Sequence, residues 1–302
     1  MGPWPVAGHN AKALALETAL SALPCTVESL FAYPVKSCAG IALTQWLLDD
    51  TGLDLDRAWM LVDERREFVT QREVPRLALV QPTLRGDELV LRAPGMLALH
   101  VAVDRVDQPL RVRVWDDTVP AWDLGPLAAQ WFSDFAGRPL RLVRFEPEHR
   151  RQSDARWTGP HAAHTAFADG FALLVLSSAS LEGLNQRLAR QGAAAVDMRR
   201  FRPNLVLGGL QAHDEDSIEW LEIDTPQGLV RLKLVKPCAR CSIPGVDPDT
   251  GSQGFEVIDA LAGYRADPRL EGAATFGMNA IVVEGAGCEL AVGQTVRAQI
   301  AF

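Results

Sequence analysis

Short apolar runs recur along this chain from Thr26 onwards, and turn-forming or charged residues separate them. In the first half these runs are Val27–Val35, Ile41–Leu48, Ala58–Val62, Phe68–Gln71, Leu77–Gln81, Glu88–Arg92, Leu97–Val103 and Leu110–Val114. Runs of this length that end at Gly, Pro and Asp residues are suited to β-strands. Many short strands at such spacing predict an antiparallel sheet or a small barrel.

Three segments have the spacing of helices instead. Apolar side chains recur three and four residues apart over Gly125–Ala136, and a second helix carries Leu181, Leu184 and Leu188 on one side. A third helix is expected near Val257–Tyr264. Further strands are expected at Leu140–Phe145, Phe171–Leu176, Asn204–Leu207, Ile218–Ile223, Leu229–Val235, Asn279–Val283 and Thr295–Ala301. The predicted fold class is therefore mainly β, an α+β fold with few helices.

A polar stretch from Glu146 to Pro160 divides the chain into two parts. We expect two β domains, residues 25–148 and 149–302, after an N-terminal tail or weak helix over residues 1–24. Lys12 and Glu17 interrupt the apolar run of that tail, and no basic segment precedes it, so it does not resemble a signal peptide. No stretch reaches about 18 consecutive apolar residues, and we therefore expect no membrane anchor.

Charge and cysteine content narrow the partners and the compartment. The 302 residues carry a formal net charge of −8, which argues against general binding to nucleic acids or anionic membranes. A local basic cluster can still hold one small anionic ligand. The five cysteines include a single close pair, so a secreted disulfide framework is not expected. We infer a reducing compartment, most simply the cytoplasm.

The close pair is Cys238-Ala239-Arg240-Cys241, and Lys236 and Arg240 supply positive charge beside it. Cations favour the thiolate form, which is the form that attacks substrates and binds metals. A structural zinc site needs more ligands than one pair supplies, and a thioredoxin-type pair would open a helix rather than a Pro- and Gly-rich turn. Two ordinary buried cysteines remain the alternative to a reactive or metal-binding thiol.

Cations and hydroxyls also cluster where several predicted strands end. They occur at Lys36-Ser37, at Asp56-Arg57, at Thr70-Gln71-Arg72, and at Arg202-Pro203-Asn204. Basic groups and exposed backbone N–H groups at strand ends suit a phosphate or another small polyanion. A solvated, charged strand edge is the alternative explanation of any one of these clusters.

Taken in order, these motifs resemble those of a known family. They are Tyr33-Pro34-Val35-Lys36-Ser37-Cys38, Asp56-Arg57, Thr70-Gln71-Arg72, Pro75-Arg76-Leu77, Phe201-Arg202-Pro203-Asn204, Pro237-Cys238-Ala239-Arg240-Cys241, Asp247-Pro248-Asp249-Thr250-Gly251 and Phe276-Gly277. The chain resembles MOSC-domain proteins with an N-terminal MOSC-type β-barrel, among them the mitochondrial amidoxime-reducing component and its bacterial relatives. That resemblance implies an N-terminal MOSC β-barrel or sheet domain followed by a MOSC β-barrel with a few helices.

The resemblance also implies a molybdenum-cofactor (molybdopterin) enzyme that reduces N-hydroxylated compounds such as amidoximes and hydroxylamines. It assigns Cys241 as the molybdenum ligand, with Cys238 as its supporting neighbour. Asp247 or Asp249 is expected to orient the ligand loop or to relay a proton. The residues it assigns to the cofactor are Lys36, Ser37 and Arg57 at the phosphate, Arg202 and Asn204 at the pterin, and Thr70, Arg72, Ser177 and Arg240 nearby.

Two departures from the family shape the expected partners. The mitochondrial members carry a hydrophobic N-terminal anchor and some bacterial relatives carry a Cys-rich ferredoxin extension, and the sequence has neither. We therefore expect electrons from a separate flavin, haem or iron-sulfur protein. The alternatives are a cofactor carrier or sulfur-transfer protein, since MOSC domains also end molybdenum-cofactor sulfurases, and a binding module for another anion.

Overall fold

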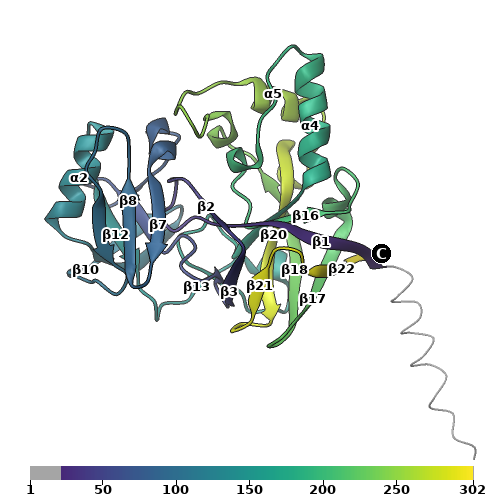
Figure 1. Ribbon diagram of the computed structural model, residues 1–302, viewed down its shortest axis with the longest axis horizontal. Coiled ribbons are helices and arrows are strands. Elements are labelled where there is room, and N and C mark those ends of the chain that lie inside the picture. Colours follow the sequence, from purple (N-terminus) through teal and green to yellow (C-terminus); the bar gives the residue numbers. More distant parts are fainter. Residues whose placement is uncertain (1–21, 302) are drawn as a thin grey trace, which may run out of the picture.

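The computed structural model describes residues 22–301, which form two β-rich halves lying side by side (Figure 1). Strands dominate both halves and only a few helices accompany them, as the spacing of apolar runs predicted. Most of the predicted tail or weak helix over residues 1–24 lies outside the described residues. The fold class predicted from the sequence is confirmed.

The first half consists of two antiparallel sheets around one core. The larger sheet has the order β10 (Gln108–Val114), β11 (Asp117–Asp123), β12 (Arg141–Phe145), β5 (Trp59–Val62) and β6 (Phe68–Val69). The smaller sheet is β7 (Gln81–Arg85), β8 (Glu88–Arg92) and β9 (Leu99–Ala102). Side chains from both sheets, among them Trp59 and Leu91, are fully buried in a shared apolar cluster. This half therefore presents a rigid base for the loops at its strand ends.

The second half is a barrel closed by seven strands. Its order is β15 (Leu173–Ser177), β16 (Leu205–Gly208), β1 (Ala22–Ala32), β22 (Thr295–Ile300), β17 (Ile218–Thr225), β18 (Gly228–Ala239) and β20 (Ala273–Glu284), and β20 pairs with β15 to close it. Closure leaves no free edge among these strands. The first described strand, β1, thus belongs to a barrel whose other strands all follow residue 172.

Short strands complete the two halves and connect them. They are β2 (Ile41–Leu43) beside β1, β3 (Gln45–Asp49) with β4 (Gly52–Leu53) and β21 (Glu289–Ala291), β13 (Arg151–Gln152) with β14 (His164–Thr165), and β19 (Ala266–Asp267) beside β20. Since β3 pairs with β21, a segment near the start of the chain lies against one near its end. This pairing ties the segment that follows β1 to the segment that precedes β22.

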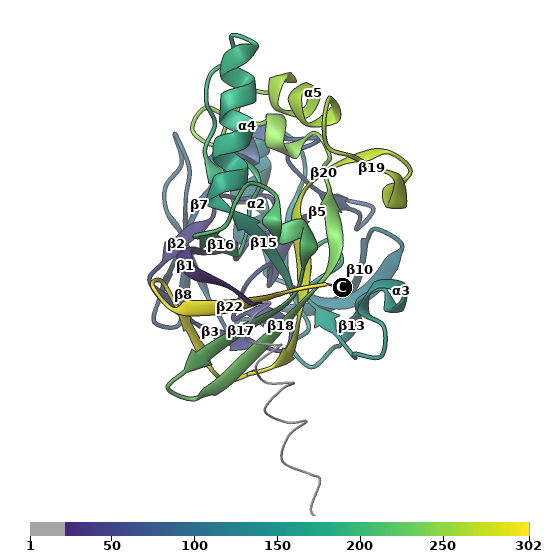
Figure 2. The same ribbon diagram turned by 90° about the vertical axis from the view of Figure 1, so that its right-hand side faces the viewer.

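The helices are short and cover one end of each half. They are α2 (Pro126–Ala136), α3 (Ala155–Thr158), α4 (Ser178–Arg190) and α5 (Glu256–Ala262), with 3₁₀ turns η1 (Pro75–Leu79), η2 (Met198–Arg200), η3 (Asp214–Ser217), η4 (Ile243–Gly245) and η5 (Pro268–Leu270). Pro126 opens α2 and Gly137, with a left-handed φ of 70°, ends it. Helices α4 and α5 lie together at one end of the barrel (Figure 2) and share a cluster with Phe201 and Phe276.

One predicted strand is wrong. The segment Leu77–Gln81 is not a strand, because residues Pro75–Leu79 form the 3₁₀ turn η1 and the next strand begins only at Gln81. Pro75 at the start of the turn favours a helical φ, and Leu77 and Ala78 are buried on its inner side. An apolar run this short does not distinguish a strand from a buried turn.

Candidate functional site

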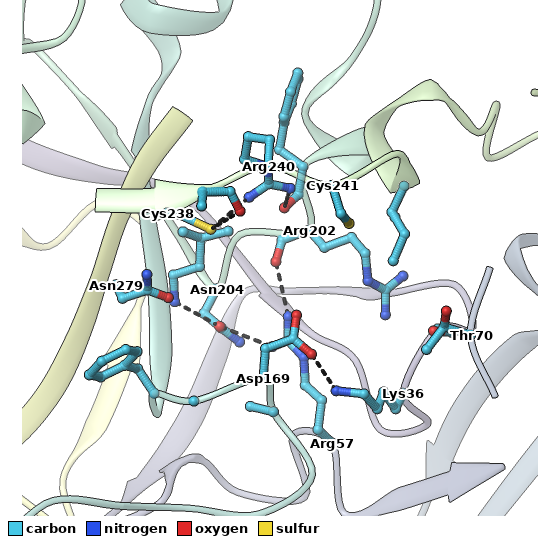
Figure 3. Close-up of a pocket in the computed structure, with 18 of the residues that line it drawn as sticks. Lys36, Arg57, Thr70, Asp169, Arg202, Asn204, Cys238, Arg240, Cys241 and Asn279 are labelled. Carbon is cyan, nitrogen blue, oxygen red and sulfur yellow. Dashed lines mark hydrogen bonds and ion pairs between the residues drawn. The ribbon is translucent and has the colours of Figure 1, made fainter. Parts of the chain in front are cut away.

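A cavity of about 430 Å³ lies between the two halves and collects most of the residues that the sequence motifs singled out (Figure 3). The predicted residues that line it are Lys36, Ser37, Arg57, Thr70, Arg72, Arg202, Asn204, Arg240 and Cys241. Cys238, Trp115, Asp169, Lys236 and Asn279 line it as well. Three predicted residues, Ser177, Asp247 and Asp249, do not line this cavity.

Strand β18 ends at the cavity and delivers the close cysteine pair to it. Cys238 lies within the strand and is half-buried, whereas Cys241 lies just beyond its end and is exposed. Arg240 Nη1 donates to Cys238 Sγ at 3.0 Å, and its Nη2 donates to the Phe201 carbonyl at 3.0 Å. Arg240 therefore holds the end of the strand in place and hydrogen-bonds the Cys238 sulfur. The Cys241 thiol is exposed and lines the cavity (Figure 3).

The loop after Cys241 is anchored to η2 by two ion pairs. Arg200 Nη2 lies 2.8 Å from Asp247 Oδ2, and its Nη1 donates to the carbonyl oxygens of Pro244 and Gly245 at 3.3 and 3.2 Å. Arg199 makes a bidentate pair with Asp249 at 2.8 and 2.7 Å. Because Arg202 lies two residues after the end of this turn, the thiol loop and Arg202 share one support.

Asp247 is held as a carboxylate. Partial burial alone would raise its pKa, but the N–H groups of Asp249 and Thr250, each 2.9 Å from Asp247 Oδ1, and the charge of Arg200 lower the pKa instead. A carboxylate that accepts this many hydrogen bonds is a loop anchor, because its protonation would break them. Of the two roles expected for Asp247 and Asp249, this geometry favours orientation of the loop over proton relay.

Two arginines lie against the same buried tyrosine ring. The guanidinium carbons of Arg57 and Arg202 lie 4.4 and 4.3 Å from the ring centroid of Tyr33. Arg57 pairs with Asp56 and donates to the Arg202 carbonyl at 3.0 Å, while Arg202 Nη1 donates to the Cys38 carbonyl at 2.5 Å. Desolvation in the cavity and the adjacent charge of Arg57 lower the pKa of Arg202 to about 10. Such close like charges form a site that favours an anion.

Strained backbone holds part of this cluster in place. Ser37, Arg57 and Arg202 have φ values of 69°, 49° and 59°, in the left-handed region that residues with side chains seldom adopt. Each such residue costs on the order of 1–3 kcal/mol. Trp115, which lines the same cavity, has a φ of 55° as well. Strain of this kind, concentrated at four residues of one cavity, is typical of ligand-binding sites.

Lys36 forms the second ionic centre of the cavity. Its Nζ donates to Asp169 Oδ1 at 2.6 Å and to the Phe167 carbonyl at 2.7 Å, and Trp115 Nε1 donates to the same Asp169 oxygen at 3.2 Å. Desolvation lowers the pKa of Lys36, and Asp169 opposes that effect. Desolvation also acts to raise the pKa of Asp169, but the Lys36 charge and the two hydrogen bonds hold it well below its ordinary value.

The amide of Asn204 is largely committed to the protein. Its Oδ1 accepts from the Leu174 N–H at 3.1 Å and from Arg57 Nη1 at 3.0 Å, and its Nδ2 donates to the Phe31 carbonyl at 3.2 Å. Asn204 therefore ties β1 to β15 and orients Arg57, although its side chain also lines the cavity. One amide hydrogen remains for a ligand.

Ser177 has a structural position. It is fully buried at the start of α4, where its Oγ accepts from the Ser180 N–H at 3.1 Å and bonds Glu215 Oε2 at 2.9 Å. These bonds cap the helix and leave the hydroxyl away from the cavity. Ser177 therefore does not line the cavity, and its contact with the cofactor stays a prediction of the family resemblance.

The cavity is strongly cationic even though the chain is acidic overall. Six cations line it, namely Lys36, Arg57, Arg72, Arg202, Lys236 and Arg240, against the single carboxylate of Asp169. Lys36 pairs with Asp169 and Arg57 with Asp56. Within residues 22–301, no carboxylate oxygen lies within 4.0 Å of the charged nitrogens of the other four. This excess of positive charge predicts an anionic occupant.

Sequence reasoning missed four residues of the cavity: Trp115, Asp169, Lys236 and Asn279. Lys236 stands two residues before Cys238 and was noted only as a nearby charge. The sequence Asp169-Gly170 ahead of a fully apolar strand is a signal for a polar group at a strand start. Trp115 and Asn279 carry no local signal, because only the folded chain brings them to the cavity.

The fold and the site define a protein of two β domains with a cationic cavity and an exposed thiol between them. Residues 24–139 match the model of the MOSC N-terminal beta barrel domain, and residues 162–297 match the MOSC domain. The chain therefore belongs to the MOSC-domain family, with an N-terminal MOSC β-barrel domain ahead of the MOSC domain.

Curated relatives agree with this assignment. The mouse mitochondrial amidoxime-reducing component 1 is 38% identical over 80% of this chain and 72% of its own, and the human protein is 35% identical over 80% and 73%. Human molybdenum cofactor sulfurase is 30% identical over 93% of this chain, which spans only 33% of that relative. Among the described residues, no helix is long and apolar enough to cross a membrane.

Proposed function

We propose that this protein is a molybdenum-cofactor enzyme that reduces N-hydroxylated compounds to the corresponding amines, amidines or bases. The observation that carries the proposal is one cavity that holds both an exposed thiol, Cys241, and a cluster of arginines and lysine suited to a phosphate. Its relatives among the amidoxime-reducing components support the reaction class. Each turnover consumes two electrons and two protons and releases the substrate oxygen as water.

The residues present fit a molybdopterin. A thiolate is a soft ligand of the kind that suits a transition metal bound through sulfur, and Cys241 offers one at the open side of the cavity. Lys36, Arg57 and Arg202 present forked or mobile donors of the type that bind phosphate.

Each protein group has a defined task in this proposal. Cys241 would ligate the metal, and Lys36, Ser37, Arg57 and Arg202 would hold the phosphate and pterin, with Thr70, Arg72 and Asn204 close by. When bound, the cofactor supplies the two-electron redox chemistry of the reaction. Asp247 and Asp249 would keep the Cys241 loop in place through Arg200 and Arg199. The electrons would come from a separate protein that carries a flavin, haem or iron-sulfur centre.

Metal content and turnover measured on the same preparation test the proposal. We expect stoichiometric molybdenum, a fluorescent pterin after oxidation, and reduction of benzamidoxime with an artificial electron donor. Cys241→Ala should fold normally by circular dichroism but lose this turnover. The matched control is Cys238→Ala, in the same close cysteine pair, which should keep most of the turnover. Full activity in Cys241→Ala would refute the assignment of the metal ligand.

The similarity to molybdenum cofactor sulfurase supports one alternative, a cofactor carrier or sulfur-transfer protein. In that case Cys241 would carry a persulfide, which mass spectrometry of the intact protein detects. A molybdenum-loaded sample that bears a persulfide and reduces no N-hydroxylated compound would favour the carrier. If the protein is purified from a host that makes the cofactor and contains neither molybdenum nor pterin, it is instead a module that binds another anion.

A further inference from the structure

Two cations of the cavity are not among the groups that would hold the cofactor directly: the proposed function places Arg72 only close to it and gives Lys236 no role. Arg72 enters from the first half and Lys236 from strand β18 of the second half, and both are half-buried. Each lies against aromatic rings: the Arg72 guanidinium is 4.6 Å from the Trp115 ring centroid, and Lys236 Nζ is 5.3 Å from that of Trp157. Neither makes an ion pair with any described carboxylate.

The charge of the cavity exceeds what one cofactor phosphate neutralises. Six cations line the cavity, and Asp169 and Asp56 compensate two of them, which leaves four. A phosphate monoester carries about 1.5 to 2 negative charges near neutral pH. About two positive charges therefore remain for another anion, and Arg72 and Lys236 supply them.

The positions of these two residues connect them to the reacting end of the cavity. Lys236 precedes Cys238 by two residues on β18, so both side chains lie on the cavity side of the strand. Arg72 uses its Nε to donate to Thr70 Oγ1 at 3.1 Å, and its two terminal nitrogens remain available. Trp115, Phe171 and Phe201 provide flat apolar surfaces around them.

We propose that Arg72 and Lys236 bind an anionic group of the substrate, which selects planar N-hydroxylated compounds that carry a phosphate or a carboxylate. This inference rests on the proposed reductase function and narrows its substrate class. A guanidinium and an ammonium beside aromatic planes bind an anion while the ring of the substrate stacks between them. Neutral amidoximes lack this contact and bind more weakly.

Two substrate pairs that differ only by the anionic group test the proposal. The first is N4-hydroxycytidine with its 5′-monophosphate, and the second is benzamidoxime with 4-carboxybenzamidoxime, so phosphate and carboxylate are assayed separately. In the wild type, KM for the anionic member of at least one pair should be lower by about tenfold, the effect of one charge-assisted hydrogen bond. Lys236→Gln and Arg72→Gln should each remove most of that difference through KM.

A matched control lies on the same strand. Lys233 is paired with Glu219 at 3.3 Å, stands over Trp220 and does not line the cavity. Lys233→Gln should keep the wild-type preference and molybdenum content. Binding of the product cytidine 5′-monophosphate against cytidine, measured by calorimetry on the molybdenum-loaded protein, gives a second readout without turnover. The monophosphate should bind about tenfold more tightly, and Lys236→Gln should abolish the difference.

The outcomes separate this inference from the proposed function. Equal KM values within both pairs, together with equal binding of the nucleotide and the nucleoside, would overturn the inference while leaving the reductase intact. Loss of molybdenum from Lys236→Gln, with the preference for anions unchanged in the loaded fraction, would show that the lysine holds the cofactor instead. If the loaded protein reduces none of the four compounds, the proposed function fails, and preferential binding of the monophosphate still decides whether the anion site exists.

Discussion

Asn204 offers a direct test of whether a cavity residue serves the protein or its ligand. Replacement by Ala removes three hydrogen bonds, to the Leu174 N–H, to Arg57 and to the Phe31 carbonyl. Asn204 is only 1% exposed, so water does not readily replace these partners. A buried donor or acceptor left without a partner costs on the order of 1–3 kcal/mol. Two backbone groups are left unpaired, and we therefore expect a loss of about 3 kcal/mol in the free energy of unfolding.

Urea denaturation of the cofactor-free protein measures this loss. The midpoint of Asn204→Ala should fall while the slope stays unchanged, which identifies a change in stability alone. The urea midpoint of Asn204→Asp should lie between those of the wild type and Asn204→Ala. The aspartate keeps both accepted hydrogen bonds but places an oxygen opposite the Phe31 carbonyl. Asn279→Ala is the control, since Asn279 lines the same cavity but makes one hydrogen bond, to the Lys236 carbonyl at 3.2 Å.

A different result would refute this reasoning. If Asn204→Ala is no less stable than Asn279→Ala and yet retains no molybdenum after expression with cofactor, the amide acts on the ligand and does not tie the strands. A large loss of stability without cofactor supports the structural role. Such a loss would also explain a secondary drop in activity, because Arg57 would no longer be oriented.

Two further perturbations address the thiols and the barrel closure. Burial raises the pKa of Cys25 to about 11 and of Cys38 to about 12, so both thiols stay protonated near pH 8. Iodoacetamide should therefore label exposed Cys241 first, as measured by peptide mass spectrometry. Early labelling of Cys38 would contradict the structure. Positive φ strains an alanine at both Gly277 (80°) and exposed Gly293 (89°), at a cost of about 1–3 kcal/mol. Gly277→Ala should destabilise the protein further in urea than Gly293→Ala, because its Cβ would lie 2.7 Å from Leu176 Cγ and 2.8 Å from the Val175 carbonyl, whereas a Cβ at Gly293 meets no atom.

Local periodicity predicted the elements better than their connections. The strand Glu88–Arg92 has the predicted bounds, and the helix predicted over Gly125–Ala136 runs over Pro126–Ala136. Nothing local shows that β1 joins a barrel formed mainly by residues after 172, since strand pairing depends on distant partners. The 3₁₀ turn Pro75–Leu79 was mistaken for a strand because its buried side chains imitate one.

The cavity residues divide in the same way. Motifs identified Lys36, Arg57, Arg202 and Cys241, and the structure places all four in one cavity. The carboxylate that pairs with Lys36 was missed because Asp169 lies 133 positions away in the chain. Ser177 matched the family motif by position, yet its hydroxyl caps α4. A motif thus locates a residue near a site, while the hydrogen bonds determine whether its side chain faces the ligand.

The backbone conformation at the cavity could not be predicted from residue preferences. Positions with φ near 60° favour Gly or Asn, and a residue with a Cβ there adds strain. At three such positions this chain has Ser37, Arg57 and Arg202, and two of them add like charges that lie against the same tyrosine ring. The strain and the repulsion both oppose folding, and no secondary structure requires either of them. Hydrogen bonds to Asn204 and to the Arg202 and Cys38 carbonyls offset part of this cost, and an anion between the two arginines, as proposed above, would offset more.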